Sequence, residues 1–348
     1  MQLISELSSF SPERETLLTI GVFDGVHLGH RHLIGNLTRR ASAENLASGV
    51  VTFNVNPKAV LSHKARLARL TTLEEKASLL KSLGVELVVP LTFTTELAAL
   101  SAREFVLYLK KYLRMRGLVI GPNFALGRGR EGTAAVLQSL GRELDFTVEV
   151  VKPLIEEGSL VSSTAIRESL ARGDLKTTAK LLGRYFSLSG TVVSGVERGH
   201  ELGFPTANIE VDHEQALPHD GVYATLAHVE DRVYQSVTNI GVKPTFGKGE
   251  RTVEVHLLDF SGDLYGKKLT IELVDHLRAE MKFAGPEELV AQIKKDIERA
   301  KEILKKSVHK RGSAEGIHPS ARGLGVSPNP SKGRRGIKGV DEDYFNNL

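Results

Sequence analysis

The chain has 348 residues, of which 41% are hydrophobic and 25% are charged, a balance typical of a globular protein with two ordinary domains. It has no cysteine, which excludes disulfides, thiolate metal sites and cysteine nucleophiles. The formal net charge of +4 is small for this length, so we expect no nucleic-acid partner. The first residues do not resemble a secretory signal, and nowhere do about 18 apolar residues follow one another. We therefore expect a cytoplasmic protein with no membrane partner.

The first half of the chain alternates between short apolar runs and amphipathic stretches. Five runs read as buried strands, at residues 17–22, 49–55, 85–91, 117–121 and 146–151. They start roughly every 30 residues, and the stretches between them carry apolar residues three and four apart. This rhythm predicts a Rossmann-like domain with a parallel, right-handed α/β sheet. Two short helices, at 163–172 and 175–182, are expected to close it.

The pattern changes after Gly183. Short alternating runs separated by Gly, Pro and Asp follow, at 187–193, 221–229, 234–242, 251–260 and 268–274. Short strands without helical crossovers predict a small antiparallel barrel. A last helix should begin at Pro286 and pack Leu289, Ile293 and Ile297 against the barrel.

These changes of pattern predict three parts: an α/β domain at 1–183, a barrel domain at 184–308 and a tail at 309–348. The tail is rich in Gly, Ser, Pro and basic residues and cannot bury a core, so we expect it to be disordered. A tail that binds nucleic acid or an acidic partner is the alternative. The few interleaved aromatic residues favour a solvated extension.

Two histidines lie three residues apart in the segment 23–30 (FDGVHLGH), directly after the first predicted strand. Parallel sheets bind ligands at this edge, and the N-terminus of the next helix favours phosphate. There His27 and His30 can donate hydrogen bonds to phosphate oxygens as charge builds, while Gly29 leaves room for a nucleotide. Ordinary turn histidines are the alternative. A zinc site is disfavoured because no third ligand is within sequence reach.

The HxGH arrangement after the first strand resembles the nucleotidylyltransferase superfamily. Its members join a nucleotide to a phosphate-bearing substrate and release pyrophosphate. The resemblance implies catalytic roles for His27 and His30. The candidate ATP- and phosphate-binding residues around them are Gly21, Phe23, Asp24 and Gly29.

The segment 162–167 (SSTAIR) opens the helix after the fifth predicted strand. Small hydroxyl residues at a helix start can be simple N-caps. Arg167, one turn inside the helix, is well placed to hold a phosphate in bidentate fashion. The segment resembles the second phosphate-binding motif of the same superfamily. Ser162, Ser163 and Thr164 are therefore candidate phosphate ligands, and Arg167 is a candidate catalytic residue.

A glycine-rich loop at 121–132 follows the fourth predicted strand and carries two arginines. We interpret it as part of the wall of the nucleotide or substrate-phosphate site. Asn123 is a candidate hydrogen-bonding residue of that wall. The alternative for the arginines is that they are solvated charges.

The segment 199–208 (GHELGFPTAN) is the densest motif of the second half. Its Pro-Thr-Ala-Asn turn sets a hydroxyl and an amide oxygen close together, and such hard oxygen ligands suit Mg²⁺ bound to ATP phosphates. A structural turn uses the same residue types, so this string alone leaves the choice open.

Five strings occur in a fixed order: 199–208, 239–246, 253–260, 263–266 and 277–283. Together they resemble the riboflavin kinase domain, a six-stranded barrel. With the HxGH domain before it, the chain over residues 15–305 resembles the prokaryotic bifunctional FAD synthetases. The resemblance implies ATP-dependent phosphorylation of riboflavin to FMN and adenylylation of FMN to FAD with release of pyrophosphate. The implied small-molecule partners are riboflavin, FMN and ATP, with Mg²⁺ or a similar divalent cation as cofactor.

The same resemblance implies roles in the barrel. Thr206 and Asn208 match ligands of the metal and ATP, with Gly199 in the same ATP-binding string. Arg278 resembles a flavin-site or phosphate contact. Glu254 matches the base that activates the ribityl hydroxyl, and a carboxylate can accept that proton. Strand alternation puts the Glu254 side chain on the face opposite to Val253 and Val255. Without the resemblance, the alternative is that Glu254 is a solvent-facing strand carboxylate.

Four positions depart from the family pattern. Val22 replaces an asparagine before Phe-Asp-Gly, and Val55 and Asn56 replace the proline and histidine of T-F-x-P-H-P. Tyr185 replaces a proline between the domains. The departures beside the adenylyltransferase site could weaken that activity.

The nearest alternative is therefore a monofunctional riboflavin kinase with an impaired or altered first domain. Another HxGH transferase would leave the barrel strings unexplained. A flavin-binding regulatory module is disfavoured because Glu254 and His30 are present. A P-loop kinase is disfavoured because the glycine-rich segment 241–249 lacks the required spacing and the final Ser or Thr.

Overall fold

The computed structural model describes residues 2–55, 60, 67–156, 159–195, 202–242 and 251–312. Two site predictions, Gly199 and the departure at Asn56, fall outside the described residues. So do residues 243–250, which include most of the glycine-rich segment 241–249, and residues 313–348, which are most of the predicted tail.

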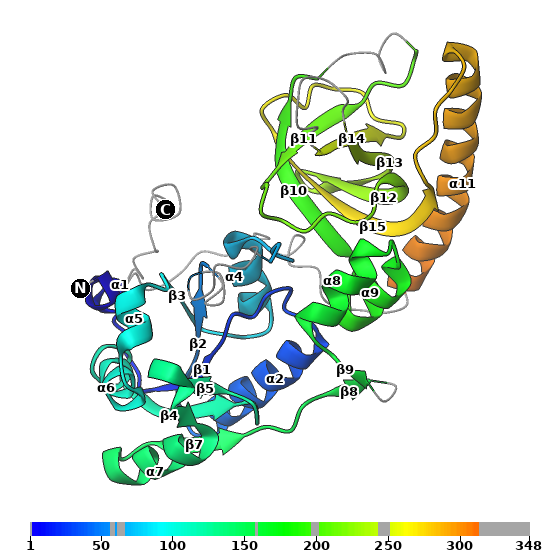
Figure 1. Cartoon of the computed structure of the whole chain (residues 1–348). Coiled ribbons are helices and arrows are strands. Elements are labelled where there is room, and N and C mark those ends of the chain that lie inside the picture. Colours follow the sequence, from blue (N-terminus) through cyan, green and yellow to red (C-terminus); the bar gives the residue numbers. More distant parts are fainter. Residues whose placement is uncertain are drawn as a thin grey trace, which may run out of the picture. The chain divides into compact units, whose positions relative to one another are not determined.

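A five-stranded parallel sheet forms the first half of the chain, in the order β3-β2-β1-β4-β7 (Figure 1). Its strands are β1 Thr16–Ile20, β2 Ala47–Phe53, β3 Leu87–Leu91, β4 Met115–Ile120 and β7 Thr147–Val150. Every neighbouring pair is parallel, so the prediction of a Rossmann-like sheet is confirmed. The order reverses between β2 and β4, on either side of β1, which is the position where such sheets bind ligands.

Helices cover both faces of this sheet. They are α1 Gln2–Ser8, α2 Leu28–Ala43, α4 Leu73–Ser82, α5 Thr95–Ala99, α6 Ala102–Leu113 and α7 Ala134–Leu144. Because strand side chains alternate, neighbouring residues of β1 enter different cores. Leu17 belongs to the apolar cluster with Ile34 of α2 and Leu80 of α4, whereas Leu18 belongs to the cluster with Phe105 of α6.

Short elements follow the sheet. A β5–β6 hairpin, with a 3₁₀ turn Arg128–Arg130 inside it, follows β4, and a β8–β9 hairpin follows β7. These strands are β5 Ala125–Leu126, β6 Gly132–Thr133, β8 Ile155–Glu156 and β9 Ser159–Leu160. The helices α8 Ser163–Ala171 and α9 Leu175–Leu182 come next, which confirms the two predicted closing helices.

The second half contains a closed antiparallel barrel in the order β10-β11-β14-β13-β12-β15. The strands are β10 Phe186–Val193, β11 Ala207–Val211, β12 Gly221–Val229, β13 Arg232–Val242, β14 Arg251–Leu257 and β15 Lys268–Arg278. Strand patterning predicts five of the six. It misses β11, which has only five residues and begins inside the string interpreted as a ligand-bearing turn.

Helix α11, Pro286–Gly312, begins at the predicted proline and packs on β12, β13 and β15. Ile297, Ala300 and Leu304 are buried, and the last two share an apolar cluster with Val222 and Leu277 of the barrel. Of the three residues predicted to pack on the barrel, Ile297 is buried, whereas Leu289 and Ile293 are only half-buried.

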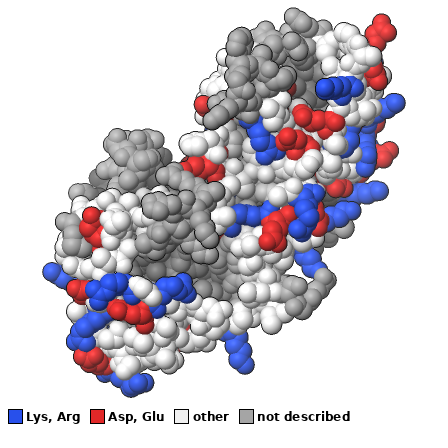
Figure 2. Space-filling view, in the orientation of Figure 1, with Lys and Arg blue, Asp and Glu red and all other residues white. Residues whose placement is uncertain are grey.

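Positive and negative side chains are interspersed on the face of the molecule shown in Figure 2 rather than gathered into one basic patch. This mixture agrees with the small net charge. Within the described ranges, no helix combines the length and apolar character needed to cross a bilayer.

Candidate active sites

The HxGH segment forms the start of α2. His27 is the N-cap of this helix, and its Nδ1 accepts a hydrogen bond of 3.3 Å from the backbone N–H of His30. The two imidazole rings are stacked, with centroids 3.6 Å apart and planes 17° apart. A Cβ at Gly29 would lie 3.2 Å from both the His27 ring and the carbonyl oxygen of Val161. Glycine thus lets the segment before α8 approach the histidines closely.

Both histidines are neutral near pH 7. Burial, with the Arg184 guanidinium second, lowers the pKa of His27 to about 4. Burial, followed by His27 and the Lys76 ammonium, holds the pKa of His30 well below its usual value. Because Nδ1 of His27 is an acceptor, its ring proton is on Nε2 and can be donated to a ligand. Nδ1 of His30 is buried and has no hydrogen-bond partner among the described residues. A bound ligand could supply that partner.

Asp24 connects the HxGH segment to two distant parts of the chain. Its Oδ1 accepts hydrogen bonds from the backbone N–H groups of Leu70 at 2.9 Å and Thr71 at 3.3 Å. Its Oδ2 forms an ion pair with Arg167, whose Nε also donates to the carbonyl oxygen of Ala68 at 2.7 Å. Asp24 is therefore not exposed to bind phosphate directly; it holds the arginine.

Arg167 is brought to the HxGH segment as predicted, but it is anchored on a carboxylate. The two bonds to Asp24 and Ala68 use two of the five guanidinium N–H groups. The remaining donors are the part of this side chain that can contact a phosphate. Sequence reasoning could not find the ion pair, because its partners are far apart in the chain.

The hydroxyl residues of the second motif have separate structural partners. Ser162 is the N-cap of α8 and its Oγ accepts from the backbone N–H of Ala165, as the simple capping interpretation predicts. Ser163 donates through Oγ to the carbonyl oxygen of Asp24 at 2.9 Å, which ties α8 to the HxGH segment. Thr164 is exposed in the first turn of the helix, where backbone N–H groups can receive an anion.

Phe23 packs against the ring of His30. It is buried, has φ of 50°, and its ring makes an edge contact with the His30 ring at a centroid distance of 5.1 Å. A Cβ at Gly21 would lie 3.1 Å from the Phe23 ring, so glycine leaves space for this aromatic side chain. Both predicted ATP-binding residues therefore contribute to the shape of the site, and the Phe23 side chain belongs to the core.

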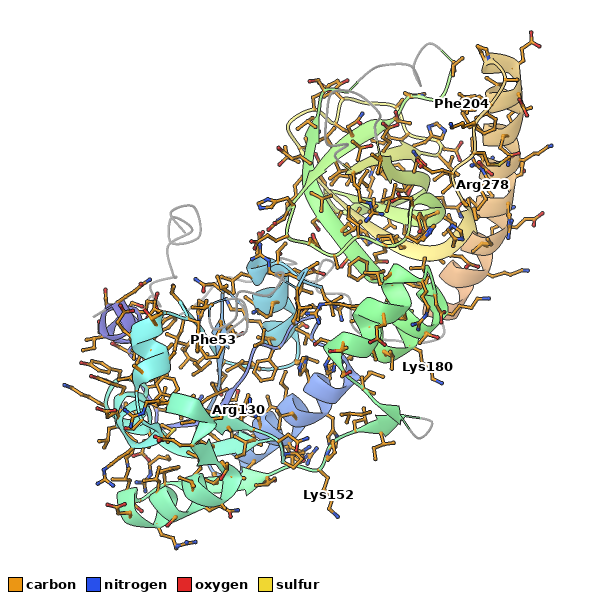
Figure 3. The ribbon with its side chains drawn as sticks, viewed as in Figure 1. Phe53, Arg130, Lys152, Lys180, Phe204 and Arg278 are labelled. Carbon is orange, nitrogen blue, oxygen red and sulfur yellow. The ribbon has the colours of Figure 1, made fainter. Side chains whose placement is uncertain are left out.

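Asn123 lies in the loop after β4, the neighbour of β1 in the sheet. Its side chain is exposed, and its backbone carbonyl oxygen accepts a hydrogen bond of 3.2 Å from the Arg130 guanidinium (Arg130 is labelled in Figure 3). The β4 loop and the HxGH segment share one edge of the sheet, as the sequence predicts for parallel strands.

Lys76 of α4 is a site residue that the sequence analysis misses. It is buried, and its Nζ donates to the carbonyl oxygens of Val22 at 3.0 Å and Phe53 at 2.9 Å. It thus joins the ends of β1 and β2 beside the HxGH segment. Burial lowers the pKa of Lys76 to about 8, although Asp24 opposes this shift. The detectable signal was a lysine on the same helix face as the buried Leu79 and Leu80.

The barrel brings Asn208 and Glu254 together. Asn208 of β11 is the direct cross-strand partner of Glu254 of β14, and Glu254 also pairs in register with Asn239 of β13. Side chains directly opposite on antiparallel strands share one face. Since Val253 and Val255 are buried in the core, this polar face lies on the outside of the barrel. The predicted orientation of Glu254 agrees with this burial pattern.

The Pro-Thr-Ala-Asn turn is attached to the same strand. His256 of β14 has its Nδ1 2.8 Å from the carbonyl oxygen of Pro205, and its ring makes an edge contact with Phe204 at a centroid distance of 5.8 Å (Phe204 is labelled in Figure 3). Thr206 is exposed between this anchor and Asn208. A Cβ at Gly195 would overlap the Asn208 side-chain amide, so only glycine at this position leaves room for that amide.

Arg278, the predicted flavin-site or phosphate contact, binds the terminal helix. Its guanidinium forms hydrogen bonds with both carboxylate oxygens of Asp296 on α11, at 2.9 and 3.1 Å, and with the carbonyl oxygen of Ala279. It also lies over the ring of Phe283, 5.7 Å from its centroid. These contacts tie the end of β15 (Figure 3) to the terminal helix.

Among the described residues, no group of three or more His, Asp or Glu side chains could hold a metal ion by itself. The oxygens of Thr206 and Asn208, with a carboxylate opposite, are of the type that binds Mg²⁺ when nucleotide phosphates supply further ligands. Their chemistry fits that ion.

An HxGH segment and a hydroxyl-capped helix at one edge of a parallel sheet, followed by a closed barrel with a carboxylate–amide pair, define a two-domain transferase. The FAD synthetase family profile matches residues 10–165, and the riboflavin kinase profile matches residues 182–304. The chain belongs to the family of bifunctional riboflavin kinase/FMN adenylyltransferases.

Relatives support this membership over most of the chain. The bifunctional riboflavin kinase/FMN adenylyltransferase of Escherichia coli K12 is 39% identical over 308 residues, covering 87% of this chain and 98% of that protein. Those of Pseudomonas fluorescens and Bacillus subtilis are 38% and 35% identical and cover 89% and 83% of this chain, and 100% and 92% of their own lengths. Both domains are present here, which favours the bifunctional interpretation over a monofunctional kinase.

A solved structure has the same fold. A Streptococcus pneumoniae protein named as a macrolide-efflux protein matches with a TM-score of 0.78 and 31% identity. The match covers 85% of this chain and 96% of that one. Its name describes that protein; the matched fold is what the two chains share.

Proposed function

We propose that this chain makes FAD from riboflavin in two ATP-dependent steps, one in each domain. The observation that carries the proposal is that each family domain gathers its own motif residues at one place. In the first domain, His27 and His30 are stacked, and Ser163 of α8 is bonded to Asp24 of the same HxGH segment. In the second domain, Asn208 faces Glu254. We propose domain limits at 183/184 and 308/309, and a cytoplasmic location, which a cysteine-free sequence allows.

In the barrel, the ribityl hydroxyl of riboflavin attacks the γ-phosphorus of ATP. Glu254 accepts the hydroxyl proton as the new O–P bond forms, and ADP leaves with the oxygen of the broken bond. Thr206 and Asn208 would hold Mg²⁺ beside the phosphates, with Gly199 approaching the same nucleotide. The cation supplies positive charge that neutralises the phosphate oxygens.

In the α/β domain, a phosphate oxygen of FMN attacks the α-phosphorus of ATP, and pyrophosphate leaves. No proton has to be removed from the attacking phosphate, so neutral histidines suit the reaction: each donates a hydrogen bond to oxygens that gain charge. The free N–H groups of Arg167 and the first turn of α8, with Thr164, would bind phosphate. Asn123 is the candidate flavin contact in the β4 loop.

The remaining predicted residues have supporting roles in this proposal. Asp24 orients Arg167, and Ser162 and Ser163 fix the start of α8. Arg278 acts on the flavin site through the position of α11 and β15 rather than as a free phosphate contact.

The experiment is chromatography of flavins after the purified protein is incubated with riboflavin, ATP and Mg²⁺. The parent chain should accumulate FAD. His30→Ala should stop FAD formation but leave FMN formation largely intact, and Glu254→Ala should do the reverse when FMN is supplied. If either variant, still folded, lost both half-reactions, this division of labour would be wrong. FMN without FAD from the parent would support the monofunctional alternative.

A further inference from the structure

A short segment between β2 and α4, residues 68–71, contacts the barrel domain through its backbone. The N–H of Arg69 donates to the carbonyl oxygen of Glu214 at 2.7 Å, and the N–H of Ala216 donates to the carbonyl oxygen of Arg69 at 2.7 Å. These two bonds form a parallel bridge between Arg69 and Gln215. We call residues 68–71 the strap.

Side chains strengthen this bridge. The Arg69 guanidinium forms ion pairs with Asp212 at 2.7 Å and with Glu214 at 3.0 Å. All three side chains are about one-third exposed or less, so water screens them only in part. One arginine with two carboxylates and two backbone bonds gives the strap a defined position on the segment 212–216 of the barrel domain.

The opposite edge of the strap holds the adenylyl-transfer site. The N–H groups of Leu70 and Thr71 donate to Asp24, and the carbonyl oxygen of Ala68 accepts from Arg167. Among these four consecutive residues, Arg69 bonds the barrel segment, whereas Ala68, Leu70 and Thr71 bond Asp24 or Arg167. A shift of the strap therefore moves both partners of the Asp24–Arg167 ion pair.

Apolar packing reinforces the same connection. Leu70 is 1% exposed and belongs to a cluster that includes Ile166 of α8 and Leu188 of β10. A Cβ at Gly25 would lie 2.9 Å from Leu70 Cδ1, so the leucine directly covers the HxGH segment. The N–H of Gly25 also donates to Thr71 Oγ1 at 3.1 Å.

We propose that the strap makes adenylyl transfer depend on the barrel domain, with Arg69 as a positioning residue for that reaction. Asp212 and Glu214 of the barrel hold Arg69, the strap holds Asp24 and Arg167, and Arg167 thereby faces the phosphates in one orientation. This inference rests on the adenylyl-transfer function proposed for the first domain. It predicts that residues of the kinase half which touch no part of the HxGH segment control FAD formation.

The test is the double variant Asp212→Asn with Glu214→Gln, which keeps size and removes both charges. With FMN and ATP supplied, we expect kcat for FAD formation to fall five- to twentyfold, while riboflavin phosphorylation stays within twofold of the parent. Arg69→Met should give the same selective loss, and Arg69→Lys should restore part of it. The matched control is Lys268→Met, which breaks the exposed ion pair between Lys268 of β15 and Glu74 of α4, outside the strap itself, and should change neither activity.

Two results would overturn the proposal. One is a folded double variant that makes FAD at the parental rate. The other is an equal loss of both activities together with a lowered Tm, because that result would show that the contact only stabilises the fold. A second readout is independent of the proposed function: amide hydrogen exchange at Leu70 and Thr71 should be at least tenfold faster in the double variant. If the parent made no FAD from FMN, the proposed function would fail, and unchanged exchange in the variant would still refute the strap.

Discussion

Asn208 and Glu254 face each other across β11 and β14, one residue beyond the point where the Pro-Thr-Ala turn joins the barrel. Strand alternation turns both away from the buried Val253 and Val255 and onto the outer face. The amide of Asn208, a proposed metal ligand, and the carboxylate of Glu254 are thereby held at the spacing of a cross-strand pair, roughly 5 Å between Cβ atoms. That spacing suits a metal-bound phosphate and an attacking hydroxyl lying side by side.

Glu254→Gln should remove the proposed base while keeping the size and register of the pair. We expect riboflavin phosphorylation to fall by roughly 10²- to 10⁴-fold, the usual range for loss of a general base. Conversion of supplied FMN to FAD should be unchanged. Glu210→Gln, an exposed carboxylate on β11, is the matched control and should leave both rates near the parental values. A Glu254→Gln enzyme that phosphorylates riboflavin normally would remove the carboxylate from the mechanism.

The sheet was predictable because buried parallel strands are nearly continuous apolar runs. The end of β1 is also marked in the sequence by the segment with glycines and histidines that follows it. Strand β11 was not, because a five-residue strand that starts at a Pro-containing turn has too little alternation to stand out. The closing helices α8 and α9 were found from their polar starts and apolar spacing.

Within the sites, local chemistry was predictable and long-range pairing was not. Ser162 caps α8 whatever the rest of the chain does, since a hydroxyl at that position satisfies a nearby N–H. The partners of Arg167 and Arg278, by contrast, are Asp24 and Asp296, which only tertiary folding brings near. The two arginines stand out in the sequence, whereas their ion-pair partners can be identified only from the folded chain.

Lys76→Met should remove the donors that join the ends of β1 and β2. The carbonyl oxygen of Val22 keeps its bond from Thr52, so the main loss is at Phe53, at a cost of about 1–3 kcal/mol for an unsatisfied buried carbonyl. We expect FAD formation to fall several-fold, with FMN formation retained. Lys81→Met, an exposed lysine at the end of the same helix, should change neither.

The pH dependence of FAD formation checks the same residue. The pKa of Lys76 is about 8 in the folded protein, below the ordinary value for lysine, so its charge is present at pH 7 and lost as pH rises through 8. Parental FAD formation from FMN should therefore decline above pH 8, and the Lys76→Met variant should lack that step. Identical pH profiles for parent and variant between pH 7 and 9 would assign the decline to another group.

Arg278 and Asp296 should be strongly coupled in stability. Asp296 is nearly buried, and removing either partner leaves the other charge poorly solvated, which costs on the order of 3 kcal/mol for a buried pair and less where water reaches the arginine. Arg278→Met, Asp296→Leu and the double variant form a cycle measured by urea unfolding. We expect the double variant to be no less stable than either single variant. Additive losses would mean that the two side chains act independently.

His27 should make the α/β domain less stable in mild acid. Its pKa is about 4 when folded and near 6.5 when unfolded, so between these values the unfolded chain binds a proton that the folded chain does not. The free energy of unfolding is therefore unaffected by this group above pH 6.5 and falls as pH drops below it, by about 2 kcal/mol at pH 5. His27→Asn keeps a side-chain oxygen for the N-cap and should lose that part of the dependence. His213→Asn, which replaces a histidine side chain that is 92% exposed, is the control and should follow the parent from pH 7 to pH 5. If His27→Asn lost as much stability in acid as the parent, the charge of another group, with His30 the first candidate, would be responsible.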